Sequence, residues 1–233
     1  MEPFKVYIGY DPRDDQAYKV CEASLRKHAS VPVRVIKLAD HELRQSGVYW
    51  RSYRVDRHGQ MWDERDGKPF STQFSFTRFA PPIIENYDEG WVLFMDADMM
   101  WRADIKELID ELDDQYAVMC VQHEHHPEEK VKMDGVLQTT YTRKNWSSLV
   151  AYNCWKNEGL TKFCLNNWSG TDLHNFKWLT DDGIGSLSHE WNFLDGYDNP
   201  DDYDPKIVHF TLGTPDMEHR PASRWDKEWW SYL

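Results

Sequence analysis

A run of five apolar residues that ends in two aspartates constrains the fold of this chain most strongly. Trp91–Met95 is typical of a strand buried on both faces, as in a parallel sheet, and Asp96 and Asp98 follow directly. Side chains two apart in extended backbone project to the same side, so the two carboxylates should point together. Open α/β sheets bind their ligands at the carboxyl ends of the strands. The sequence therefore predicts a functional site at this edge.

The acid pair itself predicts a cation. Two neighbouring carboxylates repel each other unless a proton or a cation lies between them. A hard divalent cation, which prefers oxygen ligands, is the natural occupant. The simpler alternative is that Asp98 caps the next helix and that Asp96 is a solvated loop residue.

The charge of the chain limits its partners. The 233 residues include 27 Lys and Arg against 40 Asp and Glu, which gives a formal net charge of −13. Because like charges repel, this acidity argues against nucleic acid or an anionic membrane as a partner. No apolar run approaches the length of a membrane span. An acidic protein that handles a phosphorylated small molecule needs a cation to screen its own field, which agrees with the acid pair.

Length and cysteine usage favour one domain in a reducing compartment. We expect a single domain over residues 1–233, with an insertion or acceptor loop at about residues 39–71. The four cysteines show no CxxC spacing and three of them lie in apolar segments, which indicates reduced packing residues. The first residues show no apolar region of a signal peptide, so we expect a cytoplasmic protein.

Strand and helix patterns alternate along the chain. Lys5–Tyr10, a helical pattern within Gln16–His28, and Val33–Leu38 predict a βαβ unit. Further strands are expected at 116–122, 147–152 and 206–210, and further helices from Thr72 with an interruption at Pro81, at 104–112, and over most of 156–168. The pattern predicts an α/β fold with a mostly parallel central sheet and helices on both faces.

Two segments contain histidines that could bind a metal. His209 ends the last expected strand, and its imidazole is a ligand that manganese accepts readily. If this strand lies near the acid pair, Asp96, Asp98 and His209 form one site with open positions for a diphosphate; otherwise His209 is a structural residue. The run His123–His126 lacks the spacing that places two imidazoles on one helix face, so we interpret it as a solvated or acceptor-side loop.

Asp198–Asp204 lacks the glycine and the final glutamate of a calcium loop, and we interpret it as a turn.

A series of segments forms an ordered pattern along the chain. In chain order they are Gly9–Asp11, Ser24-Leu25, Phe76–Phe79, Val92–Met99, Asp104–Leu108, Ser148–Asn153, Asp181-Asp182, Glu190–Asn192 and Ile207–Gly213. Together they resemble the core of family 8 and related GT-A glycosyltransferases. Asp-x-Asp alone is a weak signal, whereas several matches in the right order are a strong one. The resemblance spans most of the chain, except residues 39–71 and the loop after Gln122.

The resemblance implies a single GT-A, Rossmann-like domain and a role for each matching residue. Asp96, Asp98 and His209 would hold a divalent metal, Mn²⁺ or else Mg²⁺, that bridges the two phosphates of a nucleotide-sugar. The catalytic residues would be Arg78, Asp181 and Asp182, with Asp182 as the nucleophile if the reaction is a double displacement. The residues that bind the nucleotide-sugar would be Ile8, Gly9, Tyr10, Asp11, Arg78, Ala97, Asn153 and Gly213, with Tyr10 available to stack on the base.

Two departures from the family pattern bear on these roles. Gly213 is followed by Thr214–Met217 where the family usually has Lys-Pro-Trp, so Arg220, Arg224 or the metal alone would neutralise phosphate. The family's glutamine after the acid is replaced by Asp182, or else Asp181 is the extra residue. The identity of the sugar-facing carboxylate therefore stays open.

We expect a metal-dependent glycosyltransferase that moves a hexose from a nucleotide-diphosphate sugar, a UDP-sugar in the first place, to a hydroxyl acceptor. The acceptor would be a carbohydrate or another alcohol, and retention of configuration follows by family analogy only. One alternative is a metal-dependent nucleotidyltransferase, which would need a basic phosphate-binding loop near the N-terminus, where only Arg13 is available. The other is a non-catalytic carbohydrate-binding protein on the same fold.

Overall fold

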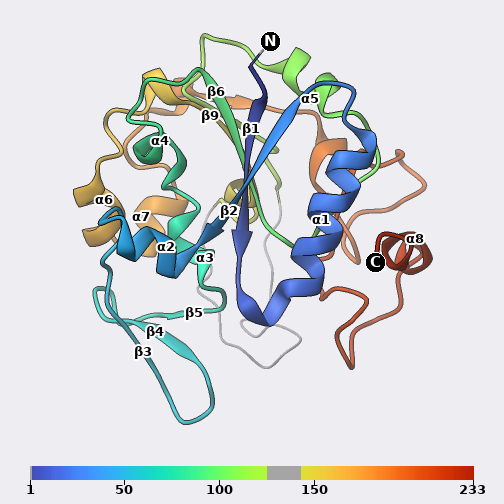
Figure 1. Ribbon diagram of the computed structural model, residues 1–233, viewed down its shortest axis with the longest axis horizontal. Helices are drawn as coiled ribbons and strands as arrows, with labels where there is room; N and C mark the ends of the chain where they lie inside the picture. Colours follow the sequence, from blue (N-terminus) through green and yellow to red (C-terminus); the bar gives the residue numbers. More distant parts are fainter. Residues whose placement is uncertain (1, 125–142) are drawn as a thin grey trace.

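A six-stranded sheet forms the centre of the computed structural model, which describes residues 2–124 and 143–233 (Figure 1). Five of its strands run in one direction, and β9 runs against both of its neighbours. The mixed, mostly parallel sheet confirms the predicted fold class. The strands, in sheet order, are β10 (Ile184–Ser186), β8 (Val118–Cys120), β9 (Leu149–Asn153), β6 (Trp91–Met95), β1 (Phe4–Tyr10) and β2 (Val33–Ala39).

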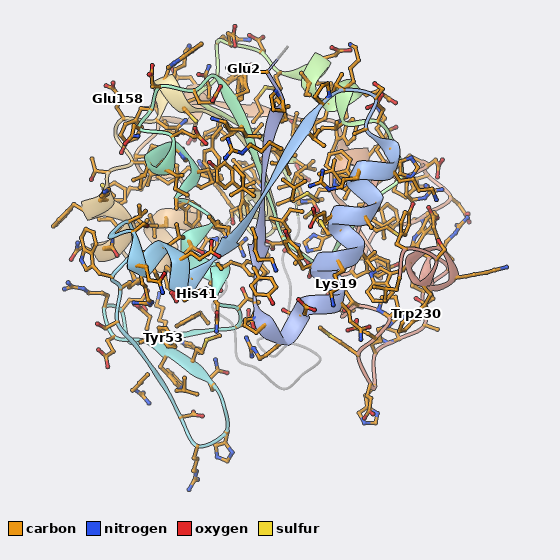
Figure 2. The ribbon with its side chains drawn as sticks, viewed as in Figure 1. Glu2, Lys19, His41, Tyr53, Glu158 and Trp230 are labelled. Atoms are coloured by element: carbon orange, nitrogen blue, oxygen red, sulfur yellow. The ribbon has the colours of Figure 1, made fainter. Side chains whose placement is uncertain are left out.

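Helices cover both faces of the sheet, and apolar side chains from strands and helices fill the space between them (Figures 1 and 2). On one face, α1 buries Val20, Cys21 and Leu25 with the helical spacing expected from the sequence. Helix α5 begins after Asp104, whose side chain accepts a hydrogen bond from Lys106 N, as predicted for an acidic cap. The helices are α1 (Asp15–His28), α2 (Asp40–Gln45), α3 (Phe74–Thr77), α4 (Pro81–Ile84), α5 (Ile105–Glu111), α6 (Lys162–Asn167), α7 (Gly170–His174) and α8 (Asp226–Trp230). No helix in the described part of the chain has the length and apolar character that crossing a bilayer requires.

A second, three-stranded sheet extends the site edge. Its strands are β11 (Phe193–Leu194), β12 (Ile207–His209) and β7 (Met99–Trp101) in that order, with β12 antiparallel to β7. The sequence pattern does not predict β7, because a three-residue apolar stretch also suits the approach to a helix. The pairing of β7 with β12 brings the end of the chain back to the acid pair.

Residues 39–71 form more regular structure than the predicted loop. Strands β3 (Tyr53–Val55), β4 (Met61–Asp63) and β5 (Pro69–Phe70) make a small antiparallel sheet that follows α2 (Figure 1). Gly59 adopts the left-handed conformation (φ 81°) in the turn of the β3–β4 hairpin, which favours glycine there. The buried ion pair between Arg51 Nε and Asp63 Oδ1, at 2.6 Å, ties β4 to the segment before β3. The short strands carry too few residues for alternation to show in the sequence.

The segment 156–168 also differs from its prediction, because only α6 is α-helical there. Thr161 caps this helix by accepting a hydrogen bond from Cys164 N at 3.2 Å. The preceding residues form a 3₁₀ turn, Cys154–Lys156, and irregular backbone.

Candidate functional site

A cavity of about 500 Å³ opens at the carboxyl edge of β6. The acid pair lines it from the end of β6, and Arg78 lines it from the chain between α3 and α4. The β3–β4 hairpin, the start of α1 and the segment after β12 supply its walls. The lining residues are Arg13, Asp14, Ala17, His58, Gly59, Ser71, Thr72, Phe74, Arg78, Asp96, Asp98, Phe210, Thr211, Leu212, Gly213, Thr214 and Met217.

The structure brings Asp96, Asp98 and His209 together. One potential ligand atom from each residue lies within 4.8 Å of the other two, and His209 Nε2 is 3.3 Å from Asp98 Oδ1. The backbone enforces this meeting, because His209 is paired with Met99 in the second sheet and Phe210 N donates to Asp98 O at 2.9 Å. Asp96 and His209 are buried and Asp98 is half-buried. The condition that the sequence left open, that the strand ending in His209 lies near the acid pair, holds in the structure.

Asn192 orients the His209 ring. Its Nδ2 donates to Ser148 Oγ at 2.9 Å and to Asn145 O at 3.2 Å, so its Oδ1 faces His209 Nδ1 at 2.9 Å. An amide oxygen only accepts, and therefore His209 Nδ1 donates to it. This contact turns Nε2 toward Asp98, which is the nitrogen that a metal at the acid pair would use. Sequence reasoning placed Asn192 only in a family-like Trp-Asn segment and assigned it no role.

The donor set at this edge fits a divalent cation. Two carboxylates supply hard oxygen ligands and one oriented imidazole supplies a nitrogen, a mixture that suits Mn²⁺. The three side chains come from two segments that the fold holds rigidly, β6–β7 and β12. The alternative role of Asp98 as a helix cap does not apply, because β7 follows it and Asp104 caps α5.

Arg78 reaches the acid pair from the chain between α3 and α4. Its Nη2 lies 3.2 Å from Asp96 Oδ1, and its Nη1 donates to Ser147 O at 3.1 Å. Ser147 Oγ in turn lies 2.7 Å from His174 Nδ1. Burial, followed by the charges of Arg78 and Lys144, holds the pKa of His174 well below its ordinary value, so this ring is neutral. Ser147 and His174 were not identified from the sequence.

The predicted nucleoside-binding residues of β1 lie behind the cavity, and none of Ile8, Gly9, Tyr10 or Asp11 is among its lining residues. Gly9 has a packing reason, because a Cβ there would lie 2.6 Å from the Phe74 ring. Ile8 is fully buried in the core. The hydroxyl of Tyr10 donates to Asp15 at 3.0 Å, and the Lys37 ammonium lies 4.0 Å from the centre of its ring.

Asp11 instead positions Arg13, which does line the cavity. The buried Asp11 carboxylate accepts from Arg13 Nε at 3.0 Å, from Arg13 Nη2 at 2.6 Å and from Gln73 N at 3.0 Å. Burial acts to raise the pKa of Asp11, but these hydrogen bonds outweigh it and lower the pKa below its ordinary value. The ionised carboxylate therefore holds a guanidinium at the cavity wall.

The predicted sugar-facing residues lie at the opposite edge of the sheet. Because β9 runs antiparallel to β6, Asn153 is paired with Trp91 and only the start of β9 lies near the acid pair, where Asp96 N donates to Ser148 O at 2.8 Å. Asp181 and Asp182 precede β10, which runs parallel to β8 and in the same direction as β6. The structure therefore does not bring these three residues to the acid pair.

The remaining predicted residues are divided between core and cavity. Ala97 is buried in the core, whereas Gly213 lines the cavity with a left-handed φ of 104°. Arg220 forms an ion pair with Asp226, and Arg224 lies 3.7 Å from Asp201. Neither arginine is among the lining residues, whereas Arg13 and Arg78 are. Of the run His123–His126, the last two histidines lie outside the described residues.

Comparison with known proteins gives one close relative in sequence. No family model matches the chain. Protein CDI of Arabidopsis thaliana is 46% identical over 220 residues, which cover 92% of this chain and 80% of that protein.

Comparison with solved structures gives the fold. The apo bifunctional glycosyltransferase WbbM superposes with a TM-score of 0.60 at 13% identity, over 99% of this chain and 52% of that chain. Apo GlyE of Streptococcus pneumoniae gives 0.59 at 17% identity, over 99% and 60%. Galactosyltransferase LgtC, solved with donor and acceptor sugar analogues, gives 0.59 at 11% identity, over 98% and 95%. The chain thus has the GT-A glycosyltransferase fold and spans about half of WbbM, 60% of GlyE and nearly all of LgtC.

Proposed function

Because this chain belongs to the family of Protein CDI and has the GT-A fold, we propose that it is a metal-dependent glycosyltransferase. The donor would be a nucleotide-diphosphate sugar, a UDP-hexose in the first place, and the acceptor a hydroxyl of a carbohydrate or another alcohol. The observation that carries the proposal is the meeting of Asp96, Asp98 and His209 within 4.8 Å, at a cavity of about 500 Å³ on the carboxyl edge of β6. Open α/β sheets bind their ligands at this edge.

Asp96, Asp98 and His209 would hold Mn²⁺, or Mg²⁺, and a metal bound there would neutralise charge that grows on the diphosphate leaving group. Asn192 keeps His209 Nε2 turned toward Asp98 through its contact with Nδ1. Arg78 would place a planar guanidinium beside the phosphate oxygens. The neutral His174 holds Ser147, whose carbonyl fixes Arg78.

The sugar carbon would be attacked without a protein nucleophile from the acidic doublet. Asp181 and Asp182 lie at the opposite edge, and the Asp181 side chain is 89% exposed. We therefore assign neither residue a role at the reacting carbon. Retention of configuration, by analogy, would then follow a front-face route, in which the acceptor enters on the side that the diphosphate leaves.

The insertion at 39–71 supports a role in substrate selection within a single domain. His58 and Gly59, at the turn of the β3–β4 hairpin, line the same cavity as Arg13 and Arg78. The hairpin therefore borders the volume that a donor or acceptor would occupy, with the His58 side chain and the Gly59 backbone.

The cysteines support a reducing compartment such as the cytoplasm. All four are free and buried. Burial raises the pKa of Cys120 and of Cys154 to about 12, so both stay as thiols at neutral pH. They act as packing residues and not as nucleophiles.

A panel of nucleotide-sugars incubated with Mn²⁺ tests the proposal. The measurement is release of a nucleoside diphosphate, first by slow donor hydrolysis and then with mono- and disaccharide acceptors. We expect one donor to be cleaved, with no release after chelation of the metal by EDTA. Pyrophosphate release would instead indicate a nucleotidyltransferase. If no donor is cleaved and metal and nucleotide do not raise the melting temperature, the result would favour a non-catalytic carbohydrate-binding protein.

A further inference from the structure

Three metal-ligand side chains meet at a second place, outside the cavity. His123 follows β8, His189 begins the 3₁₀ helix His189–Asn192, and Asp198 lies in the turn after β11. One potential ligand atom from each lies within 4.8 Å of the other two, and none of the three residues lines the cavity of the first site. We propose that this second cluster binds a zinc-class divalent metal, Zn²⁺ or Co²⁺.

The geometry of two of the ligands suits such a metal. His189 Nε2 and Asp198 Oδ2 are 3.1 Å apart. A metal at about 2.0–2.1 Å from both atoms would see them at an angle of roughly 100°, which is close to tetrahedral. Nitrogen from imidazole and oxygen from carboxylate are both ordinary zinc ligands.

The third ligand makes the cluster more than an ion pair. A hydrogen bond between His189 and Asp198 would explain why these two side chains are close, but it would not explain the presence of His123 beside them. His123 is 5% exposed, and its ring packs edge-on against the His189 ring with 4.8 Å between centroids. Three protein ligands with one open position is a common arrangement in zinc sites. The 4.8 Å limit exceeds the edge of a tetrahedral zinc site, roughly 3.4 Å, so a bound metal would require the three ligand atoms to move closer together.

Neighbouring groups hold the three segments in place. Asp198 Oδ2 accepts from Leu194 N at 2.7 Å, and Trp146 Nε1 donates to His123 O at 2.9 Å. The Tyr203 ring packs against His189 with 5.1 Å between centroids. These contacts orient the ligands from outside the cluster, as the supporting shell of a metal site does.

The second site would stabilise the first. His189 and Asn192 share one short 3₁₀ helix, and Asn192 holds His209 at the acid pair. A metal on His123, His189 and Asp198 would tie that helix to the end of β8 and to the turn after β11. The two sites also differ in chemistry, because the first offers two carboxylates and one imidazole and the second offers the reverse. Soft, nitrogen-preferring metals should therefore choose the second.

Cobalt binding to the metal-free, full-length protein tests the inference without any donor sugar. The readouts are the visible absorption of bound Co²⁺, the bound metal per chain after desalting, and the melting temperature with Zn²⁺. The test variants are Asp198→Asn, which keeps an acceptor for Leu194 N, and His189→Ala. Asp98→Asn removes a ligand of the first site, and Asp201→Asn is the matched control, because its side chain is 88% exposed in the same turn.

We expect Asp98→Asn and Asp201→Asn to retain one equivalent of Co²⁺ that Zn²⁺ displaces. Asp198→Asn and His189→Ala should bind it at least about tenfold more weakly. Saturating Zn²⁺ should raise the melting temperature of the parent protein by about 5–10 °C and that of Asp198→Asn by much less. Unchanged Co²⁺ binding in Asp198→Asn, or binding that disappears in Asp98→Asn, would overturn the inference. If His189→Ala does not fold, Asp198→Asn decides the outcome.

Discussion

The two edges of the central sheet carry similar residues in very different surroundings. At the carboxyl edge of β6, Asp96 is buried and lies beside Arg78 and within reach of His209. Before β10, Asp181 is 89% exposed and pairs at 2.5 Å with Arg143, whose side chain is 20% exposed. An ion pair with an exposed carboxylate is worth little, whereas charges gathered in a buried cavity act strongly on a ligand. An acidic doublet in a sequence therefore indicates chemistry only where the fold surrounds it.

The largest expected effect is at the carboxyl edge, in Asp98→Asn. The change removes one charged ligand while keeping the size of the side chain, so nucleoside diphosphate release should fall by about 10²–10³ at saturating Mn²⁺. Steady-state turnover and circular dichroism would be measured together, since the fold should be preserved. Asp181→Asn is the matched control. Turnover within tenfold of the parent would show that the carboxyl edge is not the reaction site.

Arg78→Lys should have the next largest effect. The planar Arg78 guanidinium contacts Asp96 Oδ1 and Ser147 O simultaneously through two nitrogens. A lysine ammonium has one nitrogen and cannot reproduce this geometry. We expect a fall in kcat/KM of about 10- to 100-fold for the donor, measured by diphosphate release. Arg143→Lys is the matched control and should stay within about twofold, because the partner of Arg143, Asp181, is exposed. Equal losses in both variants would contradict the distinction between the two arginines.

Asn192→Ala should weaken the site through His209 alone. Without Asn192 Oδ1 the imidazole loses the acceptor that fixes its tautomer, so the apparent affinity for Mn²⁺ should fall by about 10- to 100-fold. Turnover should recover when Mn²⁺ is raised to saturation, which separates a positioning role from a catalytic one. Asn192→Asp keeps an acceptor for Nδ1 and should restore most of the affinity. A loss of turnover with unchanged Mn²⁺ dependence would argue against this role.

The smallest expected effect is in Asp182→Asn. Because Asp182 precedes β10 at the far edge, turnover should change by about twofold or less. The measurement is kcat with the donor that the panel identifies. A loss of turnover of 100-fold or more would contradict the placement of Asp182 away from the reaction site, since it would require this residue to approach the sugar.

The sequence predicts the carboxyl edge well, because its signal is strong and local. Five apolar residues and two acids define β6 and the point where it ends, and the polar cap of α5 follows. The arrival of His209 depends on β7, a three-residue strand with no alternation of its own. The family-like pattern therefore predicts the approach of His209, whereas hydrophobic periodicity alone gives no sign of it.

The placement of Asn153 was mispredicted for a physical reason. Both faces of β9 are buried, so its residues do not alternate between apolar and polar. A continuous apolar run of this kind does not indicate whether the strand is parallel or antiparallel to its neighbours. The direction of β9 decides whether Asn153 or Ser148 lies near Asp96. The sequence indicated no role for Asn192, because its hydrogen-bond partners, Ser148 and His209, are distant in sequence.

The β3–β4 hairpin gives the cavity a wall that is separate from its floor. His58 and Gly59 belong to a small sheet, whereas Asp96 and His209 are anchored in the two sheets beneath. Substitutions in the turn at 56–60 can thus reshape the opening while the charged groups keep their places. Among relatives of this chain, a change of preferred ligand should therefore appear first as variation in that turn, against an unchanged set of acids.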